Sequence, residues 1–233
     1  MRRTFEEQRE RLVNGLKNDN IIKSKEVETA FLNIPREAFV WSNMIEEAYF
    51  DVPLPLGNSG QTISAPHMVA IMLEELELKK GEHVLEIGTG SGYNATLMAY
   101  IVSDGKKDLK GKVVTIERIF GLVNFAKSNI NKTNYSDYVQ VVEGDGSLGY
   151  PPRAEGEFYD KITITAASPR FPKALIKQLK VGGVLLAPIG GVLYQTLTKG
   201  RKMADGGLKI EKKTECIFVP LIGEDGYPIN GIP

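Results

Sequence analysis

The segment that decides the fold is HVLEIGTGSGY, residues 83–93. Its first part, Val84–Ile87, is a short apolar run that predicts a buried strand. Its second part is a Gly-x-Gly-x-Gly turn, in which glycines tolerate positive φ and let a ligand approach the backbone closely. A helix is expected from about Tyr93, so the free N–H groups of its first turn would face the same ligand. The segment therefore predicts a strand–turn–helix unit that binds a small molecule.

The residues around the turn distinguish between two classes of ligand. A dinucleotide fingerprint, Gly-x-Gly-x-x-Gly, needs its third glycine at the position that Tyr93 occupies. Glu86 would repel a pyrophosphate but can accept hydrogen bonds from an amino-acid ammonium, directly or through water. Glu117 ends the next expected strand, where a carboxylate can accept both hydroxyls of a ribose. The ligand is therefore predicted to be zwitterionic, S-adenosyl-L-methionine. The residues predicted to bind it are Glu86, Gly88, Gly90, Gly92 and Glu117.

The same residues have simpler explanations. The Gly-rich turn is also compatible with tight packing alone, and Glu117 with a solvated strand end. The loop Glu143–Gly146 follows the third expected strand and could place Asp145 on an adenine amino group. Asp-Gly is also an ordinary turn sequence, so this loop by itself does not indicate a site.

Strands and helices alternate after residue 83. Strands are expected at 84–87, 113–117, 139–142, 160–165 and 184–188, and helices at about 93–102, 121–130 and 174–179. Nearly continuous apolar strands predict a mostly parallel sheet covered on both faces. Short edge strands joined by polar turns are expected at 194–197, 208–210 and 216–219. The predicted fold class is α/β, a doubly wound, mostly parallel sheet of the Rossmann-like type with antiparallel C-terminal edge strands.

The part before the sheet is expected to be mainly helical. Helices are expected at 4–18 and 25–32, a short one through Phe39, and one from Ser64 to about Leu78 that Gly81 stops. We expect a single methyltransferase domain over residues 1–233. Its three parts would be a helical N-terminal part bearing the active-site loop (1–80), a cofactor-binding α/β core (81–200), and C-terminal edge strands with a tail (201–233).

Composition and charge limit the compartment and the partners. Hydrophobic residues make up 42% of the 233 residues and charged residues 25%, which is typical of a globular protein with a core. The net charge of zero gives no general attraction to nucleic acid or to anionic membranes, so neither is expected as a partner. Cys216 is the single cysteine, which favours a reducing cytoplasm. We expect a soluble, cytoplasmic protein without an export signal, a membrane span or a metal site.

The segment Gly60–Met68, GQTISAPHM, together with residues 84–93, resembles the protein-L-isoaspartate O-methyltransferase family. Nearly the whole chain fits the family. The glycine motif is shared by many methyltransferases, whereas the stretch Gln61–His67 is the specific part. Supporting segments lie at 35–40, 51–57, 117–118, 144–146, 159–160, 165–167 and 218–221.

The resemblance implies methyl transfer from S-adenosyl-L-methionine to the free carboxylate of L-isoaspartyl residues in damaged proteins, with S-adenosyl-L-homocysteine as the other product. The methyl ester then cyclises to a succinimide and partly reopens as normal aspartate, so the implied function is repair. By the same resemblance Ser64 is the active-site residue, and Gln61, Thr62, Ile63, Ser64, Glu117, Asp145 and Gly146 contact the cofactor. The residues expected on the substrate side are Ser64, His67, Ala166, Val219, Pro220 and Leu221.

Two polar residues in the specific stretch have competing roles. A carboxylate is already ionised at neutral pH, so the Ser64 hydroxyl could orient it without acting as a base or a nucleophile. Ser64 also fits a plain helix N-cap before Ala65 and Pro66. His67 would lie in the first helical turn, where the helix dipole disfavours protonation, so a structural or substrate-positioning role is expected rather than a catalytic one.

Other functions and other segments stay open. A methyltransferase for a small molecule or for RNA would share the glycine turn, although RNA enzymes of this fold often carry Asn-Pro-Pro-Tyr-like motifs where this chain has TAAS, residues 165–168. A non-catalytic module that binds adenosyl ligands need not keep the Ser64 region. The insert 103–112 is expected to be a solvated loop. The turn-rich segment 223–233 is compatible with a cap on the peptide groove, an assembly element or a loose tail, and the oligomeric state is not predicted.

Overall fold

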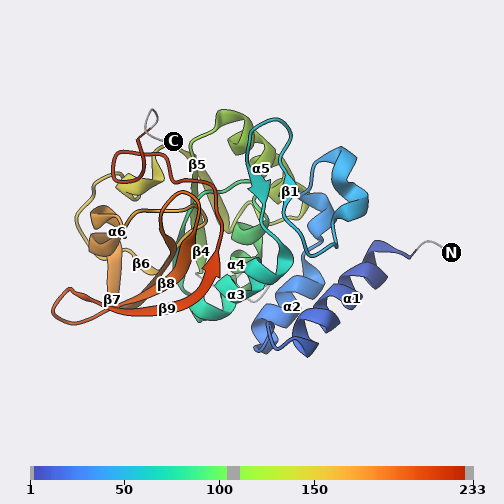
Figure 1. The fold of residues 1–233 in the computed structure, drawn as a ribbon, viewed down its shortest axis with the longest axis horizontal. Coiled ribbons are helices and arrows are strands. Elements are labelled where there is room, and N and C mark those ends of the chain that lie inside the picture. Colours follow the sequence, from blue (N-terminus) through green and yellow to red (C-terminus); the bar gives the residue numbers. More distant parts are fainter. Residues whose placement is uncertain (1–2, 104–110, 229–233) are drawn as a thin grey trace.

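The centre of the molecule is a seven-stranded sheet with the order β5-β4-β3-β6-β7-β8-β9 (Figure 1). The computed structural model describes residues 3–103 and 111–228. The strands from β5 to β7 run parallel, and β8 and β9 are antiparallel to their neighbours. This confirms the doubly wound α/β prediction. The strands are β3 (His83–Ile87), β4 (Lys112–Glu117), β5 (Val139–Glu143), β6 (Tyr159–Ile164), β7 (Leu179–Gly190), β8 (Gln195–Lys202) and β9 (Leu208–Cys216).

The strand order reverses at β3, and this places the binding crevice. From β3 the chain moves outward to β4 and β5, and then returns to the other side of β3 to form β6. In open α/β sheets, ligands bind outside the carboxyl ends of the strands at such a switch point. The glycine turn after Ile87 therefore lies where the connections to β4 and β6 diverge.

Each face of the sheet has its own apolar core, because neighbouring residues of a strand point to opposite faces. Val84 belongs to the core under the helices α1 to α5, and Leu85 belongs to the core under α6. Both faces are thus covered, as the apolar strands predicted. Figure 1 shows α1 and α2 at the N-terminal end of the molecule, away from β7, β8 and β9. The helices are α1 (Phe5–Asn18), α2 (Lys25–Asn33), α3 (Pro66–Leu76), α4 (Tyr93–Ser103), α5 (Phe120–Lys132) and α6 (Lys173–Gln178).

The N-terminal part is less regular between α2 and α3. It contains two 3-10 helices, η1 (Arg36–Ala38) and η2 (Ser42–Glu47). Two short strands, β1 (Leu54–Pro55) and β2 (Thr62–Ile63), then pair antiparallel. This pairing brings the loop around residue 51 beside the specific stretch that begins at Gln61. A third 3-10 helix, η3 (Gly146–Leu148), follows β5.

Helix α3 begins and ends at other residues than the sequence suggested. Its N-cap position is Ala65, where no side chain caps the helix, so the N-cap explanation of Ser64 is wrong. Asp51 provides the hydrogen-bond acceptor at the start of the helix instead, because its Oδ1 accepts the N–H of His67 at 2.8 Å. The helix stops at Glu77, which has the left-handed φ of 53°, and not at Gly81.

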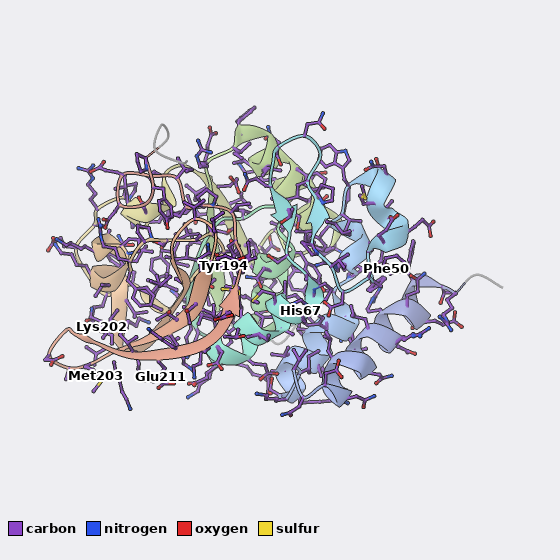
Figure 2. The ribbon with its side chains drawn as sticks, in the orientation of Figure 1. Phe50, His67, Tyr194, Lys202, Met203 and Glu211 are labelled. Carbon is purple, nitrogen blue, oxygen red and sulfur yellow. The ribbon has the colours of Figure 1, made fainter. Side chains whose placement is uncertain are left out.

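The C-terminal strands are longer and fewer than expected. Strand β8 continues to Lys202, and β9 runs without a break from Leu208 to Cys216, so the separate strand predicted at 216–219 is wrong. The charged residues from Glu211 to Glu215 are typical of a polar turn, which is why a break in the strand was expected. An edge strand tolerates such residues because one side of it faces solvent. In Figure 2, Lys202, Met203 and Glu211 lie along this β8–β9 ribbon.

Two expectations fall partly outside the described residues. The insert 103–112 includes 104–110, and the C-terminal segment includes 229–233, and neither of these ranges is described. In the part that is described, no helix is both long enough and apolar enough to span a membrane.

The ionised carboxylate of Glu77 should stabilise the fold through its ion pairs with Lys199 and Arg201, and this stabilisation should be lost at acidic pH. Burial alone would raise the pKa of Glu77, but hydrogen bonds from Lys199 and Arg201 outweigh it and lower this pKa to about 2. A pKa below the unfolded value means that the stabilisation is present above about pH 4.5 and is lost as the pH falls toward 2. Because the carboxylate is partly exposed, Glu77→Gln should lower the unfolding free energy by about 1 kcal/mol at pH 7.

Chemical unfolding of the wild type and Glu77→Gln at pH 7 and at pH 2.5 measures this effect. The exposed Glu26→Gln on α2 is the matched control and should change little at either pH. An unfolding difference for Glu77→Gln that is equal at both pH values would contradict the ion-pair explanation.

Candidate cofactor and substrate site

A cavity of about 380 Å³ opens at the carboxyl ends of β3, β4 and β6. This volume lies within the range of about 300–1,000 Å³ that small-molecule sites occupy. Its walls come from the stretch after β1, the glycine turn, and the segment that follows β9. The predicted site residues that line it are Gln61, Thr62, Ile63, Ser64, Gly88, Gly90, Glu117, Gly146, Ala166, Val219, Pro220 and Leu221.

The glycine turn is held closely against the end of β6. Gly88 has a φ of +98°, and a Cβ there would lie 2.4 Å from Oγ1 of Thr165. That hydroxyl donates to the carbonyl of Gly88 at 2.6 Å, so no side chain can be accommodated at Gly88. Gly92 does not line the cavity; a Cβ there would lie 3.0 Å from Ile130 of α5. The structure therefore shows a packing contact for Gly92, and its predicted contact with the cofactor stays a prediction.

Glu117 stands at the cavity wall at the end of β4. Its Oε2 accepts the N–H of Gly90 at 3.0 Å, and its Oε1 accepts the N–H of Ile119 at 3.0 Å. A carboxylate has about four acceptor positions, so both oxygens keep the capacity to accept hydroxyl groups. Glu117 therefore fixes the glycine turn from the β4 side and still presents acceptors to the cavity.

The carboxylate of Glu86 does not line the cavity. It is fully buried behind the glycine turn, where it accepts hydrogen bonds from Asn94 and Thr115. Burial raises the pKa of Glu86 to about 7, although these two hydrogen bonds act in the opposite direction. Glu86 therefore lies behind the cavity wall in this structure.

The Asp145 carboxylate is used by the chain itself. Its Oδ1 accepts the N–H and the hydroxyl of Ser147 at 2.9 and 2.7 Å, and its Oδ2 accepts the N–H of Glu224 at 2.7 Å. The Ser147 hydroxyl oxygen accepts the N–H of Asp225 at 3.0 Å. The structure thus places Asp145 outside the cavity wall, while its neighbour Gly146 lines it. The described part of the C-terminal segment is tied down and is not a loose tail.

Ser64 lines the cavity and is positioned through its backbone. Its carbonyl accepts a hydrogen bond of 2.8 Å from Nη2 of Arg36. Arg36 is fully buried, donates through Nε to the carbonyl of Ala48 at 2.9 Å, and lies 5.1 Å from the ring centroid of Tyr93. Burial lowers the pKa of Arg36 to about 10, so the guanidinium is charged at neutral pH. One buried charge therefore joins the two loops on this side of the cavity.

His67 lies beside the cavity rather than in its wall. Nδ1 of His67 is 2.9 Å from Oδ1 of Asp51, the same oxygen that accepts the backbone N–H of His67. Both side chains are partly exposed. Figure 2 shows His67 at the start of α3, near the centre of the molecule.

Among the residues that sequence reasoning did not assign to the site, three hold predicted site residues in place. Asn94 lines the cavity from the first turn of α4 and contacts Glu86, Arg36 holds Ser64, and Asp51 holds His67. The position of Asn94, two residues after the last glycine, was a usable signal because that turn faces the ligand. Arg36 and Asp51 act across 28 and 16 residues of sequence, so no local pattern could reveal them.

The chain is similar to one protein family over most of its length. A family profile described as Protein-L-isoaspartate(D-aspartate) O-methyltransferase (PCMT) matches residues 7–226. A protein-L-isoaspartate O-methyltransferase of Staphylothermus marinus is 48% identical over 97% of this chain and 99% of its own length. The protein of the same name from Pyrococcus horikoshii is 50% identical over 93% of this chain and 94% of its own length.

Two solved structures at lower sequence identity also match most of this chain. A Plasmodium falciparum protein-L-isoaspartate O-methyltransferase in complex with S-adenosyl-L-homocysteine superposes with a TM-score of 0.80 at 28% identity, covering 91% of this chain and 96% of that chain. Another structure, titled protein-L-isoaspartate O-methyltransferase, gives a TM-score of 0.81 at 33% identity, covering 94% of this chain and 67% of that chain.

Arg36 should matter for stability although its charge is costly to bury. Arg36→Met would leave the carbonyls of Ala48 and Ser64 without a donor, and each buried unpaired acceptor costs about 1–3 kcal/mol. Removing the guanidinium also removes its desolvation cost, which includes an unpaired Nη1 among the described residues. We expect a net loss of about 2 kcal/mol in the unfolding free energy.

Urea unfolding of Arg36→Met and of the exposed Arg11→Met checks this expectation. The Arg11 variant should stay within about 0.5 kcal/mol of the wild type. If Arg36→Met is as stable as the wild type, the hydrogen bonds of Arg36 stabilise the fold by no more than the desolvation of its guanidinium costs.

Proposed function

The chain belongs to the protein-L-isoaspartate(D-aspartate) O-methyltransferase family, and on that premise we propose how its residues divide the work. It is an S-adenosylmethionine-dependent carboxyl O-methyltransferase that methylates the free carboxylate of L-isoaspartyl residues in damaged proteins. Methylation begins repair, because the ester cyclises to a succinimide that partly reopens as normal aspartate. Which residues carry each role is the proposal.

Glu117 and the glycine turn would hold the cofactor. The observation that supports the fit is the position of Glu117 in the cavity wall, with acceptor capacity that the chain does not use, as two ribose hydroxyls require. Backbone groups of Gly88, Gly90 and Gly146 and the stretch Gln61–Ile63 complete the walls around it. When bound, S-adenosyl-L-methionine supplies a methyl group that its sulfonium has already activated.

Ser64 would orient the substrate carboxylate. This carboxylate is ionised at neutral pH, so the residues of the site need to align it and exclude water rather than remove a proton. The Ser64 hydroxyl is not committed to capping α3, and Arg36 fixes the backbone that carries it. We assign His67 the role of a substrate-positioning residue at the rim, held by Asp51.

The segment Val219–Leu221 would hold the peptide next to Ala166. The carbonyl of Val219 accepts the N–H of Ala167, and the N–H of Leu221 donates to the carbonyl of Ala167, both at 2.7 Å. In this bridge the carbonyl of Pro220 points to the opposite side, where an extended peptide can pair with it.

The partner and compartment assignments belong to the same proposal. Isoaspartyl-containing proteins and peptides would be the partners, with no part played by nucleic acid or a membrane surface, since the formal net charge is zero. A cytoplasmic location fits the free, buried thiol of Cys216. The three parts 1–80, 81–200 and 201–233 would act as one domain, because residues of all three line one cavity.

Two peptides that differ only in one linkage test the function. The enzyme is incubated with labelled S-adenosyl-L-methionine and with an isoaspartyl peptide or its aspartyl counterpart. We expect base-labile methylation of the isoaspartyl peptide alone. Equal labelling of both peptides, or labelling of neither, would overturn the substrate assignment.

Ser64→Ala tests the division of labour. Losing the group that aligns the carboxylate should lower kcat about a hundredfold, while the Kd for S-adenosyl-L-homocysteine should change less than threefold. The exposed Ser128→Ala on α5 is the matched control and should change neither. Equal losses in kcat and in cofactor affinity would make Ser64 a cofactor-binding residue instead.

A further inference from the structure

Glu86 anchors a buried chain of hydrogen bonds behind the glycine turn. Its Oε1 accepts Nδ2 of Asn94 at 2.8 Å, and its Oε2 accepts the hydroxyl of Thr115 at 2.5 Å. The Thr115 oxygen lies 2.7 Å from the hydroxyl of Thr89. Because Thr115 donates to Glu86, its oxygen is the acceptor for Thr89.

Both ends of this chain reach the cavity, although its centre does not. Thr89 lines the cavity from within the turn, and Asn94 lines it from the first turn of α4. Glu86 and Thr115 face each other on neighbouring strands, and Thr163 occupies the matching position on β6. A buried carboxylate is thus connected to the cavity through a side-chain amide on one side and a hydroxyl on the other.

The amide of Asn94 has one atom without a partner. Its Oδ1 is buried and accepts no hydrogen bond from any residue that the structure describes. An ionised carboxylate can only accept, so Glu86 in that state keeps the NH₂ group of Asn94 toward itself and Oδ1 away. A protonated Glu86 can donate instead, which lets the amide turn and leaves its NH₂ group outward. The charge of Glu86 therefore decides whether Asn94 offers an acceptor or a donor.

We propose that Asn94 binds the α-ammonium of the cofactor through Oδ1, directly or through one water, and that ionised Glu86 is the positioning residue that gives Asn94 this orientation. The inference rests on the proposed function, which supplies a ligand with an α-ammonium. An ammonium has donors only, so it needs the acceptor that an outward NH₂ group would withhold.

The affinity for the cofactor should then depend on pH near neutrality. Burial raises the pKa of Glu86 to about 7, against the hydrogen bonds of Thr115 and Asn94, and the charge of Glu117 raises it further. The groups that contact or flank Glu86 from β4, β6 and α4 are the neutral Thr115, Thr163 and Asn94. An ammonium ligand selects the ionised state, so binding releases a proton and affinity falls as the pH drops below about 7.

Two ligands separate this role from a structural one. Calorimetry measures the Kd of S-adenosyl-L-homocysteine and of methylthioadenosine, an adenosyl thioether without the amino-acid part. Asn94→Ala should weaken S-adenosyl-L-homocysteine about tenfold or more, since a hydrogen bond to a charged group is lost, and should leave methylthioadenosine unchanged. The exposed Asn33→Ala on α2 is the matched control and should alter neither Kd.

Variants around Glu86 test the coupling to pH. For the wild type, the Kd of S-adenosyl-L-homocysteine should rise about fivefold between pH 7 and pH 6 and show proton release. Glu86→Gln should remove this dependence. Thr115→Val keeps the carboxylate but removes a hydrogen bond that favours its charge, so the pH midpoint should move upward by about one unit.

The possible failures can be told apart. If Asn94→Ala weakens both ligands equally, Asn94 only supports the turn and the inference is wrong. A wild-type affinity that is flat between pH 6 and pH 8 would overturn the role of Glu86. A wild-type chain that binds S-adenosyl-L-homocysteine but methylates no isoaspartyl peptide would contradict the proposed function and leave the Asn94 result intact. A wild type that does not bind this ligand at all would overturn both.

Discussion

The structure depends on the glycine turn after β3, which hydrogen bonds from the ends of β4 and β6 fix on both sides. After β3 the backbone passes between Thr165, which donates to the carbonyl of Gly88, and Glu117, which accepts the N–H of Gly90. A Cβ at Gly88 would collide with Oγ1 of Thr165, so only glycine lets the turn pack this closely against the end of β6. The reversal of strand order at β3 supplies these two neighbours, because β4 and β6 end on opposite sides of it. The fold and the cavity are thus consequences of the same local constraint.

Hydrogen bonds to backbone groups join segments around this cavity that lie far apart in the sequence. Ala167 pairs with the segment around Pro220, and Asp145 holds the N–H of Glu224. On the other side, Arg36 bonds to the carbonyls of Ala48 and Ser64. Such contacts fix the walls without using the side chains that face the ligand, which keeps Ser64 available for the substrate.

The sequence predicted well what depends on local patterns and less well what depends on distant partners. The strand, turn and helix of residues 83–93 follow from apolar periodicity and glycine spacing, and the parallel core follows from their repetition. The extent of β9 did not follow, because the charges around Lys212 and Lys213 satisfy an exposed edge and a polar turn equally well. The sequence suggested an adenine contact for Asp145. It did not reveal that Asp145 accepts the N–H of Glu224, because the two residues are 79 positions apart in the sequence. The packing of α5 against Gly92 also depends on a distant segment, and the glycine spacing does not reveal it.

Two charged side chains among the described residues, Arg36 and Glu86, have no exposed surface at all. Burying a charge costs several kcal/mol, and replacing a buried polar group together with its partners by well-packed apolar side chains is often neutral or stabilising. Lys199 is also nearly buried, but it has the partly exposed carboxylate of Glu77 as an ion-pair partner. Both buried charges lie directly behind the cavity wall, Arg36 behind Ser64 and Glu86 behind Asn94. Proteins depart from local rules of stability mainly at functional sites, and here the two departures flank the place where an anionic substrate must meet a cationic donor.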